Sequence, residues 1–261
     1  MDVAAYLDRI GAREPREPTL EALAELSLDH LCSVPFENLD IAAGRPLSLD
    51  LDALYDKIVV RRRGGFCYEL NGLFSWLLRE LGYDVALLAG QTIDPATGAP
   101  GHPLAHLVLL VELDGPRLVD VGWGEAYRRP FALRVDNEHT DPLIAAYRLD
   151  LHDGRWHVVE RHDDSLETNL KPIAGWRIAY RFDLTPHTLA DFTEACRWQE
   201  TESPFFTGHC FCTMATSDGR RTLMDERLIV REAGTRTERP VTEAEWPSLL
   251  EELFGVRDAL I

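Results

Sequence analysis

A cysteine placed between a glycine pair and a long helical pattern constrains this chain more than any other feature. Gly64 and Gly65 precede Phe66 and Cys67, and they form a flexible turn that leads into the cysteine. Beyond Cys67 the apolar residues recur every three or four positions until Gly82 offers a natural helix end. These apolar residues are Leu70, Leu73, Phe74, Leu77, Leu78 and Leu81. The pattern predicts an amphipathic helix with Cys67 in its first turn.

The first turn of a helix is a favourable place for a reactive cysteine. Its free backbone N–H groups and the positive end of the helix dipole stabilise a thiolate. A thiolate is a strong nucleophile near neutral pH, so the placement of Cys67 favours covalent catalysis. The alternative is a small buried apolar side chain, which is the commonest fate of a free cysteine. The local pattern leaves both interpretations open.

The composition is ordinary for a globular protein, with 45% hydrophobic and 27% charged residues in a chain of 261. The 44 acidic and 27 basic side chains give a net charge of −17. Such a charge repels nucleic acid and anionic membranes, so we expect neither as a partner. Any polyanionic ligand has to meet locally positive groups.

The cysteines and the N-terminus indicate a reduced, cytoplasmic protein. Met1–Tyr6 has neither a basic region nor a long apolar stretch, so no secretory signal is expected. The five cysteines are an odd number without the spacing of a disulfide scaffold. His209–Cys212 holds two cysteines and a histidine, but no second ligand cluster completes a tetrahedral site, so no metal is expected.

The sequence divides into three regions that we expect to pack as one body. Residues 1–84 carry helical stripes, and residues 186–261 mix helical and strand patterns. Residues 85–185 carry short β-branched runs with Asp-Gly hairpin signals at Asp114-Gly115 and Asp153-Gly154. The middle region therefore predicts a mostly antiparallel sheet or small barrel. Its predicted strands are 85–89, 104–113, 117–121, 131–135, 146–151, 156–160 and 177–184.

A nucleophilic cysteine needs a base, and the base needs an orienting group. His106 begins one apolar strand, and Asp120 lies near the end of the next. Pairing about the hairpin turn sets Asp120 opposite roughly Leu109. His106 is then reached by a diagonal approach or through a bulge at Pro116.

Two other interpretations of these histidines remain open from the residues alone. His106 can be a satisfied strand-end histidine without a catalytic role. His102 is its nearest rival as a base, but it precedes Pro103 in a Gly/Pro-rich loop and should be held less rigidly. The preferred combination is Cys67, His106 and Asp120.

Several segments of the chain resemble one known family, the arylamine N-acetyltransferases. They occur in the same order along some two hundred residues: Val34–Asp40, Arg63–Gly72, His106–Val111, Asp120–Gly124 and, more weakly, Ser203–Phe206 and Asp218–Arg220. The resemblance implies an α+β fold of three parts: an N-terminal helical bundle, a central antiparallel β-barrel and a C-terminal α/β lid. The first two parts are then arranged as in a papain-type thiol protease.

The resemblance also implies a chemistry. Cys67, His106 and Asp120 would form a Cys–His–Asp triad. Acetyl-coenzyme A would acylate Cys67, and an arylamine or arylhydrazine would then take the acetyl group by ping-pong kinetics. No metal cofactor is implied, and a monomer or homodimer is expected.

The resemblance assigns residues to the binding of coenzyme A and of the acceptor. The loop after Asp120 resembles the family's glycine-containing coenzyme A loop, although Trp123 stands where the family usually has Phe. The residues expected to bind coenzyme A are Gly122, Gly124, Arg128, Arg129, Ser203 and Phe206. Aromatic walls suit a flat acceptor ring, and the candidates are Phe36, Phe66 and Phe206, with core packing as the alternative for each. Glu37 and Arg63 are expected to form an ion pair that braces the glycine turn.

Three other functions share parts of this pattern. An amide synthase on the same scaffold would take a longer acyl chain and close a macrolactam, and the departure at Trp123 suits a different donor. A thiol protease shares the triad but needs an open peptide cleft, which the third region is expected to cover. A non-catalytic binding module would leave Cys67 without a chemical role.

Overall fold

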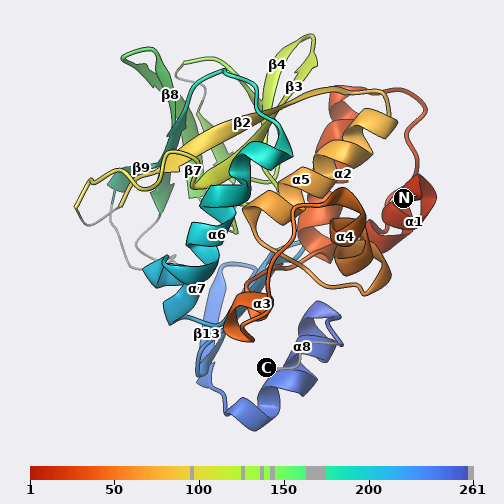
Figure 1. Ribbon diagram of the computed structural model, residues 1–261, viewed down its shortest axis with the longest axis vertical. Helices are drawn as coiled ribbons and strands as arrows, with labels where there is room; N and C mark the ends of the chain where they lie inside the picture. Colours follow the sequence, from red (N-terminus) through yellow and green to blue (C-terminus); the bar gives the residue numbers. More distant parts are fainter. Residues whose placement is uncertain (95–96, 125–126, 136–137, 142–144, 163–174, 258–261) are drawn as a thin grey trace.

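The computed structural model describes residues 1–94, 97–124, 127–135, 138–141, 145–162 and 175–257. Figure 1 shows three parts: helices on the right, a strongly twisted sheet at the upper left, and a second sheet with the C-terminal helix below. This arrangement confirms the predicted α+β fold, with a helical part, an antiparallel barrel-like sheet and a third α/β part.

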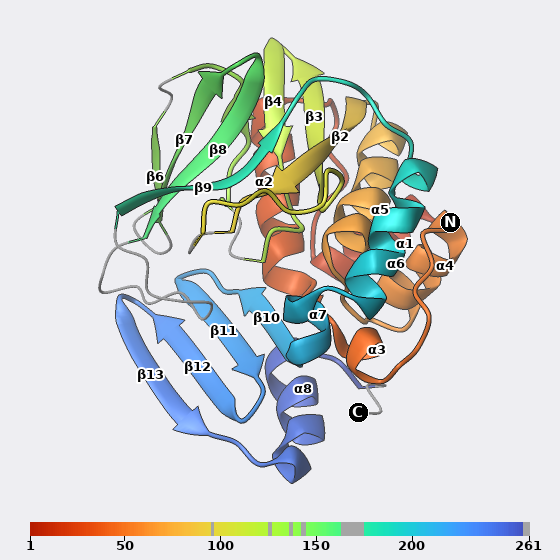
Figure 2. The same cartoon turned by 60° about the vertical axis from the view of Figure 1, so that its left-hand side comes forward.

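The helical part is organised around α5 (Cys67–Glu80). Its apolar stripe is the one predicted, and the side chains of Leu70, Leu73, Phe74 and Leu77 are fully buried. Helix α5 packs on one side against the large sheet, and α1 (Val3–Ile10) and α4 (Leu51–Tyr55) contact its other side (Figure 2). The other helices of this part are α2 (Leu20–Ser33), α3 (Leu39–Ala42) and the π-helix η1 (Asp56–Val60).

The central part is one antiparallel sheet of eight strands in the order β5-β4-β3-β2-β9-β8-β7-β6. Both Asp-Gly pairs stand at hairpin turns, as predicted. The strands are β2 (Asp84–Thr92), β3 (His106–Leu113), β4 (Gly115–Val119), β5 (Phe131–Ala132), β6 (His139–Asp141), β7 (Ala145–His152), β8 (Arg155–His162) and β9 (Gly175–Phe182). Each predicted strand of this region therefore has a counterpart.

The β3–β4 hairpin decides how His106 and Asp120 meet. Leu109 pairs with Val119 rather than with Asp120, so the predicted register was off by one residue. Continued past that pair, the register sets His106 opposite Gly122, and Asp120 then shares a face with His106 on the diagonal. The pairing shows no bulge at Pro116, so the diagonal approach is the one that the structure uses.

The third part is a sheet of five strands in the order β1-β10-β11-β12-β13, seen at the lower left of Figure 2. Its edge strand β1 (Phe36–Glu37) comes from the N-terminal region and pairs with β10 (Phe211–Ala215). The other strands are β11 (Gly219–Met224), β12 (Arg227–Glu232) and β13 (Thr235–Pro240). The helical elements are η2 (Leu189–Phe192), α6 (Thr193–Thr201), α7 (Pro204–Gly208), η3 (Glu243–Glu245) and α8 (Trp246–Phe254).

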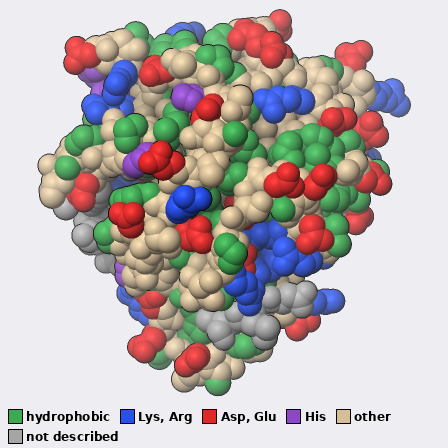
Figure 3. All heavy atoms as spheres, in the orientation of Figure 1, with side chains coloured by type: hydrophobic (Ala, Val, Ile, Leu, Met, Phe, Trp, Pro, Cys, Tyr) green, Lys and Arg blue, Asp and Glu red, His purple; other side chains and the backbone are tan. Residues whose placement is uncertain are grey.

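The surface reflects the excess of acidic residues. Acidic side chains are spread over the face shown in Figure 3, with basic side chains among them. Within the described residues, no helix has the length and apolar character needed to cross a membrane.

Candidate active site

The three residues of the preferred combination come together at the N-terminal end of α5. Cys67 is the first residue of α5, His106 is the first residue of β3, and Asp120 follows the last residue of β4. The three residues are 4%, 2% and 2% exposed. Nε2 of His106 lies 2.7 Å from Oδ2 of Asp120.

The Cys67 sulfur lies against the backbone on both sides of His106. Its Sγ is 3.9 Å from the carbonyl oxygen of Ala105, to which the thiol donates. The backbone N–H groups of Leu107 and Tyr68 also act on the sulfur and lower the pKa of the thiol. The thiol therefore faces the segment that carries the imidazole.

Burial raises the pKa of the Cys67 thiol well above its usual value, and the negative charge of Asp120 acts in the same direction. The N–H groups of Leu107 and Tyr68 lower the pKa, but they do not offset burial. Burial therefore opposes the stabilisation that a helix N-terminus gives a thiolate. Ionisation of Cys67 needs a neighbouring group that accepts the proton.

Each carboxylate oxygen of Asp120 has two hydrogen-bond partners. Oδ1 accepts from Asn71 Nδ2 and from the Gly122 N–H, both at 2.9 Å. Oδ2 accepts from the Tyr180 hydroxyl at 3.1 Å and lies 2.7 Å from Nε2 of His106. Because a carboxylate only accepts, this arrangement selects the tautomer with hydrogen on Nε2 and leaves Nδ1 free to take a proton.

Asn71 joins the helix to both strand segments. It lies one turn after Cys67 on α5, and its Nδ2 also donates to the Leu107 carbonyl at 2.7 Å. Its Oδ1 accepts from the Val121 N–H at 2.9 Å. Asn71 was not among the predicted site residues, although a polar residue inside a buried helix is a signal for such a role.

Two aromatic rings enclose the imidazole of His106. The ring centroids of Trp123 and Tyr180 lie 4.9 Å and 4.7 Å from that of His106. Tyr180 comes from β9, and its hydroxyl is within 3.4 Å of the Tyr127 hydroxyl. Tyr180 was not predicted either, since nothing in its local pattern places it beside residues 60 positions earlier in the chain.

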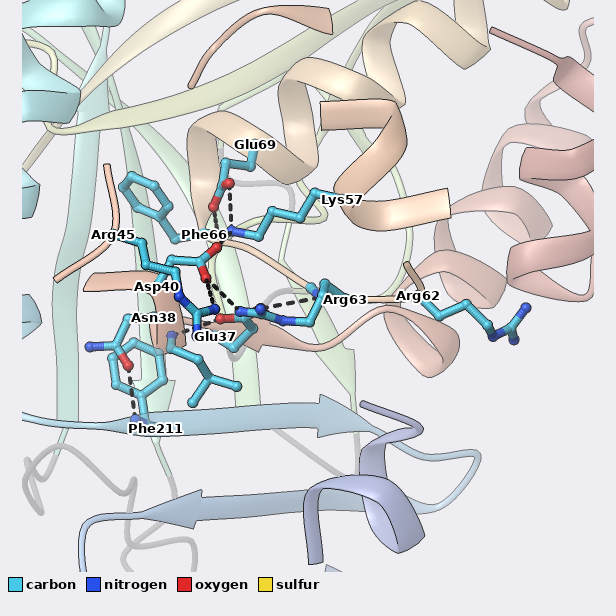
Figure 4. A network of polar contacts seen from close by, with 12 residues as sticks. Glu37, Asn38, Asp40, Arg45, Lys57, Arg62, Arg63, Phe66, Glu69 and Phe211 are labelled. Carbon is cyan, nitrogen blue, oxygen red and sulfur yellow. Dashed lines mark hydrogen bonds and ion pairs between the residues drawn. The ribbon is translucent and has the colours of Figure 1, made fainter. Parts of the chain in front are cut away.

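The turn that leads into α5 is held by a buried network of charges, drawn in Figure 4. Nη2 of Arg63 is 2.9 Å from Oε1 of Glu37, which confirms the predicted ion pair. Nζ of Lys57, on the π-helix, lies 2.7 Å from both Glu69 and Asp40. Burial lowers the pKa of Lys57, but the carboxylates around it more than compensate, so the net shift is upward and Lys57 is a cation.

This network contacts the backbone next to Cys67 directly. Oε2 of Glu69 accepts from the Phe66 N–H at 3.1 Å, and Oε1 of Glu37 accepts from the Gly64 N–H at 3.3 Å. A Cβ on Gly64 would lie 2.0 Å from the Pro35 carbonyl oxygen, so this position requires glycine. At Gly122 a Cβ would lie 2.7 Å from Cα of Cys67, so glycine is needed there as well.

The two arginines expected to bind coenzyme A have different surroundings. Arg128 is buried and donates to the carbonyls of Thr216, Ser217 and Gly219, at 2.7, 3.2 and 2.6 Å. It thereby fastens the β10–β11 turn to the central part. Arg129 is exposed beside it. Residues 125–126 of this loop lie outside the described residues.

The remaining candidates gather around α7. Phe66 is buried and lies edge-on to Phe206, with 5.3 Å between ring centroids. Phe36 stacks on Phe211, with 5.6 Å between ring centroids. A Cβ on Gly124 would lie 3.3 Å from Cδ1 of Phe36. The Ser203 carbonyl accepts from the Thr207 N–H inside α7, and Ser203 itself is buried.

Within the described part of the chain, no metal ion could be held by a cluster of three or more histidine, cysteine, aspartate or glutamate side chains. The groups that the site does bring together are a thiol, an imidazole and a carboxylate.

Comparison with known proteins identifies the family. The sequence pattern of an N-acetyltransferase family matches residues 19–259. Human arylamine N-acetyltransferase 1 is 30% identical, over 98% of this chain and 94% of its own. The arylamine N-acetyltransferase of M. tuberculosis has a TM-score of 0.87 at 32% identity, covering 98% of this chain and 94% of that one. The Mycobacterium marinum arylamine N-acetyltransferase in complex with CoA has a TM-score of 0.85 at 31% identity, covering 98% and 93%. The chain belongs to the arylamine N-acetyltransferase family.

Proposed function

We propose that this protein transfers an acetyl group from acetyl-coenzyme A to an arylamine or arylhydrazine, through an acetyl-Cys67 intermediate and by ping-pong kinetics. The observation that carries the proposal is the position of the Cys67 thiol, against the backbone on both sides of an imidazole that is bonded to Asp120. Membership of the family and the CoA complex of a related protein support the choice of donor.

Acylation begins with the proton of the thiol. His106 takes this proton on Nδ1 because Nε2 already donates to Asp120. The sulfur then attacks the thioester carbon of the donor, and the carbonyl oxygen becomes an oxyanion. The Cys67 N–H belongs to the first helical turn, where an N–H has no intrahelical acceptor, so it is a suitable donor to the oxyanion. The coenzyme A sulfur leaves and takes the proton back from His106.

In deacylation the Cys67 sulfur is the leaving group and the amine is the nucleophile. A weakly basic aromatic amine is neutral at pH 7 and attacks the thioester carbon of acetyl-Cys67. His106 accepts the proton that the amine loses, and Cys67 leaves as a thiolate paired with the imidazolium. Transfer of this proton back to the sulfur restores the starting state.

We assign the binding residues as the family resemblance does. Gly122, Gly124, Arg128 and Arg129 would contact coenzyme A, together with Ser203 and Phe206. Of the two arginines, the exposed Arg129 is the better placed to meet phosphate, because Arg128 already donates to three carbonyls. Phe36, Phe66 and Phe206 would line the acceptor site, where Phe36 and Phe206 are half-buried and Phe66 is buried.

The decisive experiment is mass spectrometry of the whole protein after brief exposure to acetyl-coenzyme A. We expect one acetyl group on Cys67 in the wild type and none in Cys67→Ser. Cys196→Ala is the matched control, because Cys196 is also buried, and it should still be acetylated. Subsequent addition of an aromatic hydrazine should remove the acetyl group. Absence of the adduct, or an adduct on another cysteine, would contradict the proposal.

The same experiment tests the amide synthase alternative. A protein that remains unmodified by acetyl-coenzyme A but takes a long-chain acyl group from its thioester would have a different donor. The proposal would then be wrong about the acyl group while Cys67 would remain the carrier.

A further inference from the structure

The backbone just before His106 is held by side chains from two helices. The Tyr68 hydroxyl, on α5, donates to the Leu104 carbonyl at 2.7 Å. Nε2 of Gln199, on α6, donates to the next carbonyl, that of Ala105, at 3.1 Å. Gln199 is 5% exposed, and its hydrogen bond to Ala105 spans 94 positions of the chain. The two backbone carbonyls that precede His106 are thus each held by a side-chain donor.

The Ala105 carbonyl is also the acceptor of the Cys67 thiol hydrogen, with 3.9 Å between oxygen and sulfur. While the sulfur carries its proton, this contact is weakly attractive. When the sulfur becomes an anion, the partial negative charge of the same carbonyl oxygen repels it. In a buried site this repulsion opposes ionisation of the thiol.

A second donor on the same oxygen changes this balance. The amide hydrogen of Gln199 satisfies the Ala105 oxygen when the thiol hydrogen has left, and it offsets part of the oxygen's negative charge. Without Gln199, loss of the thiol proton would leave a buried carbonyl unsatisfied and facing an anion.

We propose that Gln199 is a positioning residue for the nucleophile: by donating to the Ala105 carbonyl, it favours transfer of the Cys67 proton to His106. In that transfer the S–H bond breaks, an N–H bond forms on Nδ1 of His106, and the net charge of the pair is unchanged. Gln199 acts through Ala105. The inference rests on the proposed function, because it assumes that Cys67 reacts as a thiolate.

Two variants separate this electrostatic role from simple packing. Gln199→Met preserves the length of the side chain but has no N–H donor. Gln199→Glu preserves its shape and replaces the donor with a carboxylate that faces the same carbonyl. Arg197→Met, on the exposed side of the same helix, is the matched control.

The test is the rate of alkylation of Cys67 by iodoacetamide as a function of pH, measured peptide by peptide in the full chain. In Gln199→Met we expect the pH profile of the alkylation rate to shift to higher pH by about one unit, which slows alkylation of Cys67 at pH 7 about tenfold. Gln199→Glu should move it further, and Arg197→Met should leave it in place. The pH profile needs no acyl donor, so it is independent of the acetylation experiment.

Two results would overturn the inference while the proposed function stands. One is a wild-type pH profile in both Gln199 variants. The other is alkylation slowed by the same factor at every pH, which indicates altered access of iodoacetamide to Cys67. If Cys67 of the wild type reacts no faster than a free thiol, the proposed function itself fails and the inference fails with it. Thermal unfolding of each variant identifies one that has lost its fold, and the near-isosteric Gln199→Glu then decides the question.

Discussion

Asn71 donates from Nδ2 to Oδ1 of Asp120 at 2.9 Å, and this hydrogen bond connects the helix of the nucleophile to the strand end of the carboxylate. The same amide reaches the Leu107 carbonyl and the Val121 N–H. A side chain one turn from Cys67 thus sets the distance between α5 and the β3–β4 hairpin.

Asn71→Ala should therefore disturb both stability and chemistry. It leaves the Leu107 carbonyl and the Val121 N–H buried without their partner, and we expect a loss of about 2–3 kcal/mol in the free energy of unfolding. Acetylation of Cys67 should slow by at least about tenfold. Denaturant unfolding and single-turnover acetylation measure the two effects. Ser75→Ala, which removes another buried polar group one turn further along α5, is the control and should spare the chemistry. Fast acetylation in Asn71→Ala would contradict the positioning role.

Asp120→Asn keeps the shape of the carboxylate and removes its charge. Its amide group presents hydrogens toward donors such as the Tyr180 hydroxyl, and it no longer selects the Nε2–H tautomer of His106. We expect acetylation of Cys67 to fall about a thousandfold or more. The rate is measured in a single turnover with acetyl-coenzyme A, and Asp153→Asn, at an exposed hairpin turn, should match the wild type. A fall of less than about tenfold would show that His106 does not need the carboxylate.

Lys57→Met tests the buried charge network. The substitution leaves Glu69 and Asp40 without the cation that lies 2.7 Å from each. We expect a loss of about 3–5 kcal/mol in the free energy of unfolding, because Glu69 stays buried without a cation. Asp40, in contrast, keeps its ion pairs with Arg63 and Arg45.

Arg61→Met is the matched control for this change. Arg61 pairs with Asp56 on the surface, with about half of each side chain exposed, and such a pair contributes at most about 1 kcal/mol. Equal losses in the two variants would mean that burial of the network has no energetic consequence.

His30 should make the fold sensitive to acid. Its ring is fully buried, and neither ring nitrogen has a hydrogen-bond partner among the described residues. Burial, with a smaller contribution from Arg9, lowers the pKa of His30 from 6.5 to about 3. As the pH falls, the unfolded chain therefore binds a proton at His30 before the folded chain does. Above pH 6.5 this group does not lower the free energy of unfolding, and between pH 6.5 and about 3 the free energy of unfolding declines.

The decline should approach about 1.4 kcal/mol per pH unit for this one group. His30→Phe places a ring of similar size beside Phe74, whose centroid is 5.0 Å from that of His30, and it should flatten the dependence of the unfolding free energy on pH. His102→Phe, at a partly exposed loop residue, should retain it. An unchanged slope in His30→Phe would assign the acid sensitivity to other groups.

The local patterns of the sequence predicted much of the fold. The apolar stripe after Cys67 predicted the helix and its buried face, because helical periodicity depends only on residues close together in the sequence. The Asp114-Gly115 signal predicted the hairpin but not its register. A slip of one residue turns every side chain of a strand to the other face, so the register depends on which face is buried, and a turn signal alone does not contain this information. Where the strand 131–135 was predicted, the structure has only Phe131–Ala132, and the Arg134 N–H then donates to the Ala132 carbonyl in a turn.

The sequence by itself determined the family, the helix that begins at Cys67, the antiparallel middle part and the ion pair of Glu37 with Arg63. Only the tertiary structure brought Asn71, Tyr180 and Gln199 to the same site. Their hydrogen bonds join residues 49, 60 and 94 positions apart, and no periodicity encodes such a separation. The tertiary structure also decided the state of the thiol. The helix terminus favours an anion, but burial raises the pKa of the Cys67 thiol, so its proton needs a base within the same buried site.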